Sequence, residues 1–108
     1  GKPMKEILDS YIHLIENHEF AKAHECLEEN WKAFRTQGKK DESNILKGFI
    51  NAASAFELKR LGRESASKIW QAYLKYRVLI DEVDSLHVAQ YQECARCVEA
   101  KYKEIFEV

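Results

Sequence analysis

The sequence contains little proline, little glycine and few β-branched residues. Its only proline is Pro3, and after residue 1 its only glycines are Gly38, Gly48 and Gly62. Val, Ile and Thr together supply 14 of the 108 residues, which is too few for a core built from strands. Ala, Leu, Glu and Lys supply 46 residues, and all four favour helices. These frequencies predict an all-α fold.

Long apolar segments and an excess of positive charge are also missing. No apolar run approaches the roughly 20 residues that span a bilayer, and no signal-peptide pattern opens the chain. The 17 Lys and Arg against 18 Asp and Glu give a net charge of -1, so the charge does not indicate nucleic-acid binding. We therefore expect one soluble helical domain over residues 1–108, located in the cytoplasm and binding neither nucleic acid nor a membrane.

The three cysteines are too few and too irregular for a disulfide framework. Cys26, Cys94 and Cys97 are an odd number in a chain without secretory signals, so we expect free thiols. Cys94 and Cys97 have the C-x-x-C spacing of redox and zinc motifs, but they lie within a predicted helix and no second pair accompanies them. We expect both side chains to fill core space.

Apolar residues that recur every three or four positions predict about five helices. Their expected ranges are 4–15, 20–34, 41–61, 64–77 and 87–105. The third is apolar or small on most sides between Ile45 and Leu58, which indicates a buried central helix. Gly38 suits a left-handed helix end, and Lys39 and Lys40 are expected to be solvated turn charges. The predicted architecture is a compact bundle with short turns.

Two polar residues of the second predicted helix lie beside its apolar stripe. At 100° per residue, His24 and Glu28 fall one turn apart on the same face, so their side chains can meet. An imidazole and a carboxylate at this spacing can bind zinc, manganese or iron or exchange a proton. They can equally form a structural pair that closes the bundle, with Trp31 packed over both.

Glu57 is the candidate for a third ligand, because it lies within an apolar row of the third predicted helix. A buried carboxylate must be paired, protonated or bound to a metal. Together with His24 and Glu28 it would form a His–Glu–Glu metal site, and His87 is the other residue that could complete it. The alternative is an ion pair at the rim of the helix, with one of three cations: Lys22, Arg60 or Lys47.

Two blocks of the sequence resemble a small all-helical family of bacteria and archaea that is catalogued as a domain of unknown function (number 309). The first block lies within residues 18–31 and has the pattern F-x-x-A-H-E-x-L-E-x-x-W, met by His24, Glu28 and Trp31. The second, residues 46–56, is similar to the family's L-Q-G helix and is followed by a similar turn at residues 60–62.

The resemblance implies a metal site without an established reaction. It makes His24 and Glu28 the candidate ligands and Trp31 the packing wall beside them. The sequence departs from the family at Lys47, where Gln is usual, and at Glu57, where His is usual. Lys47 could neutralise Glu28 and make a metal unnecessary, whereas Glu57 would preserve a ligand of a harder type.

Two functions follow from these residues. The favoured one is an interaction module for a protein partner or a second copy of the chain, in which His24, Glu28 and Trp31 form a structural or binding site. Its contact surface would use aromatic side chains, namely Tyr73, Tyr76, Tyr91 and Tyr102. The alternative is a divalent-metal protein, and a vacant metal position that activates water would make it a hydrolase. The sequence leaves open whether the chain is an enzyme.

Overall fold

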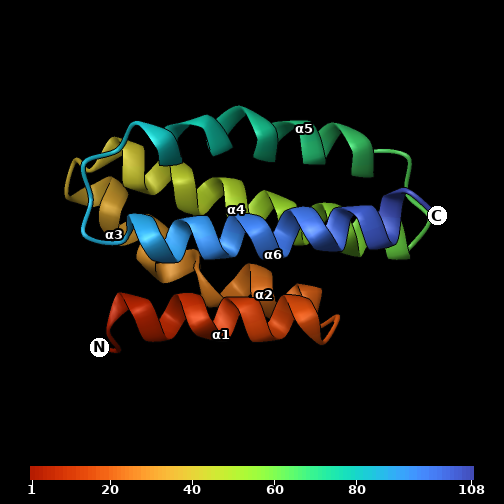
Figure 1. Cartoon of the computed structure of the whole chain (residues 1–108), viewed down its shortest axis with the longest axis horizontal. Helices are drawn as coiled ribbons and strands as arrows, with labels where there is room; N and C mark the ends of the chain where they lie inside the picture. Colours follow the sequence, from red (N-terminus) through yellow and green to blue (C-terminus); the bar gives the residue numbers. More distant parts are fainter.

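The computed structural model describes residues 1–108, all of whose regular elements are helices. The elements are α1 (Met4–Glu16), α2 (Phe20–Cys26), α3 (Glu28–Thr36), α4 (Lys40–Arg60), α5 (Ala66–Arg77), the 3₁₀ helix η1 (Val78–Asp81) and α6 (Val88–Phe106) (Figure 1). The all-α prediction is confirmed. Four of the five predicted helices end within a few residues of the expected positions.

The remaining predicted helix is broken at Leu27. This residue has φ -103° and ψ -5° and separates α2 from α3. Its side chain is fully buried in the core, and its carbonyl accepts the Trp31 N–H at 2.9 Å, which begins the ladder of α3. The break lies between His24 and Glu28, the two residues that the sequence pattern placed on one continuous helix.

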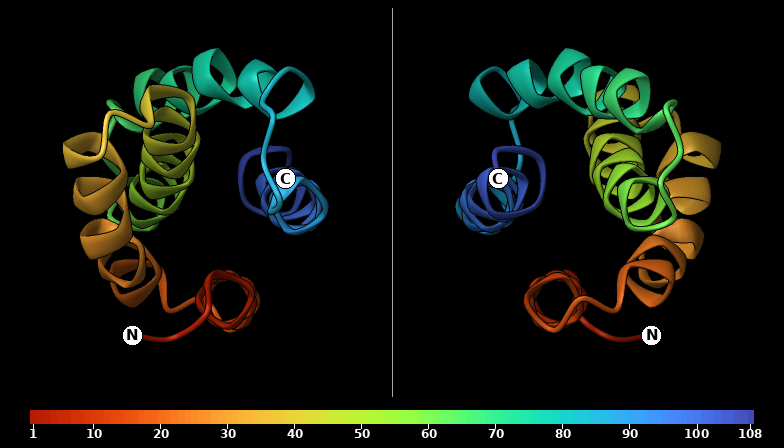
Figure 2. Two further views of the ribbon diagram at one scale, coloured as in Figure 1. Left: turned by 90° about the vertical axis from the view of Figure 1, so that its left-hand side faces the viewer. Right: turned by 90° about the vertical axis from the view of Figure 1, so that its right-hand side faces the viewer.

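The helices form an arc around the last of them. Seen along the bundle, α1 to α5 follow one another around a curve, and α6 lies in its opening (Figure 2). There α6 packs against α1 and α4. The molecule measures 37 × 24 × 22 Å, and the two termini lie at opposite ends of its long dimension (Figure 1).

Helix α4 is the centre of the core, as predicted for the third helix. It contacts α2, α3, α5 and α6, and ten of its residues are buried: Ser43, Ile45, Leu46, Gly48, Phe49, Ile50, Ala52, Ala53, Ala55 and Phe56. The small ones let neighbours approach. A Cβ on Gly48 would lie 3.1 Å from the Cβ of Tyr76, so α5 packs directly against this glycine.

Glycines end two of the helices in the left-handed conformation. Gly38 has φ +75° and Gly62 has φ +73°, values that cost a glycine little. After Gly38, the N–H of Lys39 donates to the carbonyl of Phe34 at 2.9 Å, the long-range bond of a Schellman motif. The prediction for Gly38 is confirmed, and the turn brings α3 back alongside α4.

All three cysteines are free thiols, as expected. Each contacts a backbone carbonyl of α1 through its sulfur: Cys26 to Ile7 at 3.6 Å, Cys94 to Leu8 at 3.9 Å and Cys97 to Ile12 at 3.9 Å. These are weak bonds, but they link both α2 and α6 to α1. Burial raises the pKa of all three thiols.

The expected aromatic contact surface is wrong for two of its four members. Tyr73 and Tyr91 are buried in the core, and only Tyr76 and Tyr102 are half-exposed. The Tyr73 hydroxyl donates to Glu99 at 2.6 Å, which explains how a phenol is accommodated between α5 and α6.

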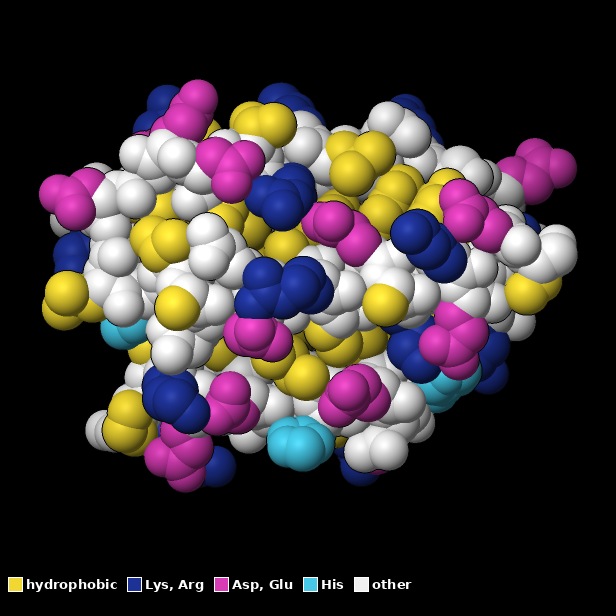
Figure 3. Space-filling model, viewed as in Figure 1, with side chains coloured by type: hydrophobic (Ala, Val, Ile, Leu, Met, Phe, Trp, Pro, Cys, Tyr) yellow, Lys and Arg dark blue, Asp and Glu magenta, His cyan; other side chains and the backbone are white.

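The outer face of α1 and α6 carries charges of both signs in close alternation (Figure 3). A membrane-crossing helix needs a long apolar stretch, and none of the helices has one.

Candidate functional site

His24 and Glu28 form an ion pair on either side of the break at Leu27. The His24 Nδ1 atom lies 3.0 Å from the Glu28 Oε1 atom, and the two side chains are 39% and 35% exposed. His24 belongs to the last turn of α2 and Glu28 to the first turn of α3. An anion is favourable at a helix N-terminus, so the Glu28 carboxylate suits the start of α3. The pair therefore spans the break.

Trp31 lies one turn further along α3 and contacts two cations. Its half-buried ring packs against the core. The Arg35 Cζ atom lies 4.9 Å from the ring centroid, and the Lys47 Nζ atom lies 5.6 Å from it. Both distances are in the range of cation–π contacts. The ion pair that Lys47 could have formed with Glu28 is absent, and the lysine side chain lies over the indole of Trp31 instead.

Glu57 is paired at the rim of α4, one of the two outcomes that the sequence allowed. The Arg60 guanidinium donates from Nε to Oε1 at 2.8 Å and from Nη2 to Oε2 at 2.7 Å. These two bonds lower the pKa of the Glu57 carboxyl below its usual range. Both carboxylate oxygens are thus already hydrogen-bonded, and the side chain is 28% exposed.

A shallow groove between α2 and α4 brings His24 and Glu57 to one surface. Its volume is about 360 Å³, and its other lining residues are Phe20, Ala21, Glu25, Ser54 and Leu58. Glu28 is not part of this lining. The groove therefore contains two of the three predicted metal ligands, with the third outside it.

The predicted metal site does not fit this arrangement. No three His, Cys, Asp or Glu side chains lie close enough together to hold a metal ion. His24 and Glu28 supply two adjacent donors, whereas zinc sites use at least three protein ligands. The carboxylate of Glu57 is taken by Arg60. Metal binding by His24, Glu28 and Glu57 stays a prediction, and we derive no reaction from it.

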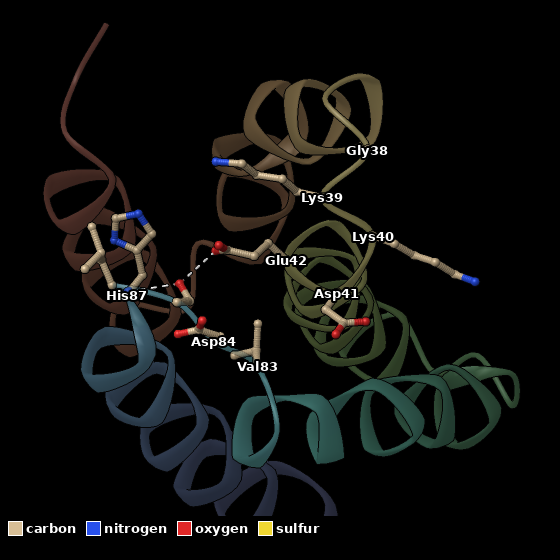
Figure 4. A pocket seen from close by; sticks show the side chains of 10 residues that line it. Gly38, Lys39, Lys40, Asp41, Glu42, Val83, Asp84 and His87 are labelled. Carbon is tan, nitrogen blue, oxygen red and sulfur yellow. Dashed lines mark hydrogen bonds between the residues drawn. The ribbon is translucent and has the colours of Figure 1, made fainter.

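His87 does not approach His24 and cannot complete its site. It lines a cavity of about 590 Å³ between the start of α4 and the loop 82–87 (Figure 4). Glu42 in that cavity and Glu57 in the groove are 15 residues apart on α4, or roughly 20 Å at the rise of an α-helix.

Glu42 organises that cavity through hydrogen bonds to the loop and to α6. Its Oε2 atom accepts hydrogen bonds from the Ser85 hydroxyl at 3.0 Å and from the Tyr91 hydroxyl. The Ser85 Oγ atom accepts in turn from the His87 N–H at 3.0 Å. Burial and the nearby Glu42 raise the pKa of Tyr91, so its proton stays on the phenol. The network anchors the loop to α4.

A second cavity, which we call the cationic pocket, lies between α3 and the first half of α4. Its volume is about 300 Å³, and its lining is Trp31, Arg35, Gly38, Lys40, Ser43, Asn44 and Lys47. Three of these residues are cations and none is an acid. The sequence singled out Trp31 and Lys47 but treated Lys40 as a solvated turn charge and did not select Arg35. The i, i+4 spacing of Trp31 and Arg35 was the available signal.

Comparison with known proteins agrees with the resemblance read from the motifs. The family model described as "Domain of unknown function (DUF309)" matches residues 8–74. This range contains the whole His24–Glu28–Trp31 pattern, the cationic pocket and Glu57. No curated protein and no solved structure matches the chain.

Proposed function

Because the chain belongs to the DUF309 family, whose function is unknown, we propose from its geometry that it is an interaction module. It binds an acidic segment of a protein partner at the cationic pocket. One observation carries this proposal: Trp31, the last residue of the motif, is flanked by Arg35 and Lys47, and neither cation is paired with a carboxylate of the chain.

The cations of the pocket are distinguished by sharing one pocket rather than by lacking a partner, because only six of the 17 Lys and Arg side chains of the chain form ion pairs with carboxylates. Lys5, Lys22, Arg60, Arg77, Arg96 and Lys101 all form ion pairs with carboxylates. Arg35, Lys40 and Lys47 form none, although they share one pocket wall. Like charges repel one another at short range, and an acidic partner relieves that repulsion. Trp and Arg are also the residues most enriched among the strong contacts of interfaces.

In this proposal His24 and Glu28 have a structural role. Their side chains meet across the break at Leu27, and the break sets where α3 begins. Trp31 lies in the first turns of α3, so its position against Lys47 of α4 depends on that start. The motif then has one part that shapes the helix junction and one part that faces the partner.

Binding of a fluorescent glutamate-rich peptide, followed by anisotropy at low and high salt, tests the proposal. The double variant Arg35→Gln/Lys47→Gln removes the two cations at Trp31. The matched control is Lys59→Gln/Lys75→Gln, which changes the net charge equally and removes lysines that lie over Phe106 and Tyr76. We expect about tenfold weaker binding for the pocket variant and less than about twofold for the control.

Three results would overturn the proposal. The first is an equal loss in both double variants, and the second is no saturable binding by the parent protein. The third is tighter binding of an oligonucleotide of equal charge. Sedimentation at the same concentrations tests the other predicted partner, a second copy of the chain. If the protein forms a dimer that buries Trp31, the partner at the pocket is a second copy of the chain and the proposal of an acidic partner is overturned.

The metal-binding alternative rests on the His24–Glu28 pair, which already places two donors side by side. A zinc, manganese or iron ion would need a further ligand from a partner or from water. Calorimetric titration with zinc and manganese tests whether the protein binds a metal at this pair. Stoichiometric binding that is lost in His24→Ala supports the alternative, and no heat in the parent protein removes it.

A further inference from the structure

We propose that the cationic pocket recognises a dianionic phosphoryl group. This inference rests on the proposed function, because it assigns the phosphoryl group to a phosphorylated side chain of the protein partner. Among acidic groups, the pocket would thus prefer a phosphoryl group to a carboxylate.

The charge balance of the pocket is the first argument. Arg35, Lys40 and Lys47 contribute three positive charges to the lining, and none of the lining residues is an acid. A carboxylate group of a partner brings one negative charge, whereas a phosphoserine brings nearly two at neutral pH. The adjoining cavity shows the contrast, since it shares Gly38 and Lys40 but also contains three acids: Asp41, Glu42 and Asp84.

The donor types are the second argument. Arg35 presents a planar guanidinium that can hold two oxygens of one phosphate, and the two lysines act as point charges around it. Asn44 adds an amide donor to the wall. Lys40 and Ser43 come from the start of α4, a helix of 21 residues, and the positive end of its dipole adds to the field of the cations.

The size of the pocket and its aromatic wall are the third argument. A volume of about 300 Å³ is at the lower limit of small-ligand sites, so a phosphoryl group leaves room for the carbon atoms that carry it. Those atoms then contact the indole of Trp31, the one apolar side chain of the lining. The pocket thus suits a phosphate monoester better than a free phosphate ion.

Nuclear magnetic resonance of the two tryptophan indole N–H groups tests the inference within one molecule. Trp31 lines the pocket, whereas Trp70 is 4% exposed in the core and serves as the internal control. The variant Trp31→Phe assigns the two signals. The titrants are a phosphoserine peptide, the same peptide with glutamate or with serine at that position, and inorganic phosphate.

We expect the phosphoserine peptide to shift the Trp31 signal in a saturable way and to leave Trp70 in place. Its affinity should exceed that of the glutamate peptide by about tenfold or more. Lys40→Gln and Lys47→Gln should each weaken it by about tenfold, and Lys75→Gln, which removes an exposed lysine outside the pocket, should not.

Four other results would overturn the phosphoryl inference, or part of it, in different ways. Equal affinity for the phosphoserine and glutamate peptides would overturn the phosphoryl inference and leave the proposed function standing. No Trp31 shift with either acidic peptide would overturn both. Inorganic phosphate that binds as tightly as the phosphopeptide would overturn the assignment to a protein-borne group. Phosphopeptide binding that Lys47→Gln leaves intact would overturn the pocket as the site.

Discussion

The imidazole of His24 and the carboxylate of Glu28 lie 3.0 Å apart, although the two residues belong to different helices, α2 and α3. An i, i+4 pair normally spans one turn of a continuous helix. Here Leu27 ends α2 and precedes α3 between the two partners. The pair therefore bridges two helix ends, and the negative charge of Glu28 lies at a helix N-terminus, where an anion is favourable.

Replacing His24 with alanine should lower the free energy of unfolding by about 0.5–1 kcal/mol, because both side chains are more than a third exposed and the pair is partly screened by water. Urea denaturation of His24→Ala, Glu28→Ala and the double variant gives the coupling energy, which we expect to be about 0.3–1 kcal/mol. The control is Glu25→Ala, an exposed neighbour without an ion pair. Zero coupling, or an equal loss in the control, would contradict the bridging role.

Gly48→Ala should destabilise the protein even though alanine is the better helix former. The gain in helix propensity is about 0.5–1 kcal/mol, but the new Cβ would lie 3.1 Å from the Cβ of Tyr76. That atom is fixed to the backbone of α5 and cannot rotate away, and overpacking costs about 1–3 kcal/mol. We expect a net loss of about 1 kcal/mol in urea denaturation.

The control for that experiment is Asn51→Ala, a half-buried position of the same helix. Asn51 already carries a Cβ, so alanine there gains helix propensity without adding a new Cβ contact, and the midpoint should stay level or rise. A higher midpoint for Gly48→Ala than for the parent protein would show that α5 can move away from α4.

The helices could be predicted because their apolar residues recur with the period of a helix and glycines mark two of their ends. The break at Leu27 could not, because residues 20–34 contain neither proline nor glycine and are compatible with one helix. The side chain of Leu27 is fully buried in the core, so the break lies at a position that packs against other helices. Local sequence therefore does not predict the position of this helix break.

The same limit applies to the candidate site. The contact of His24 with Glu28 follows from spacing alone, and so does that of Trp31 with Arg35. The position of Lys47 over Trp31 depends on how α3 packs against α4, which periodicity does not specify. Glu42 is 43 residues from Ser85 and 49 residues from Tyr91 in the sequence, so no local sequence pattern predicts the cavity that they line.

The cysteines should alkylate slowly in the folded protein. Burial raises the pKa of Cys97 to about 11, so its thiolate fraction at pH 8 is roughly a hundredfold below that of an ordinary thiol. Cys94 is fully buried and should react only after unfolding. Mass spectrometry of iodoacetamide adducts at pH 8, with and without urea, checks the order. Rapid labelling of Cys94 without urea would contradict the packing of α6 against α1.

Arg60→Gln should raise the pKa of the Glu57 carboxyl toward its usual value, because hydrogen bonds from Arg60 are the main cause of its lowering. A carboxyl whose pKa is lowered by folding stabilises the folded state above its ordinary pKa, and this contribution disappears as the pH falls through the lowered value. In the Arg60→Gln variant, the free energy of unfolding should therefore depend less on pH in the acid range. Carbon-13 chemical shifts of the Glu57 carboxyl measure the pKa directly, and Arg63→Gln, which removes a nearby cation without an ion pair, should leave it unchanged.

The same variant separates the two roles proposed for Glu57. Once Arg60 is removed, both carboxylate oxygens are free in the groove that also contains His24. If Glu57 is a metal ligand, zinc should bind Arg60→Gln more tightly than the parent protein, because the competing guanidinium is gone. If neither protein binds zinc, Glu57 is only the partner of Arg60, and the His24–Glu28 pair lacks the third ligand that a metal centre requires.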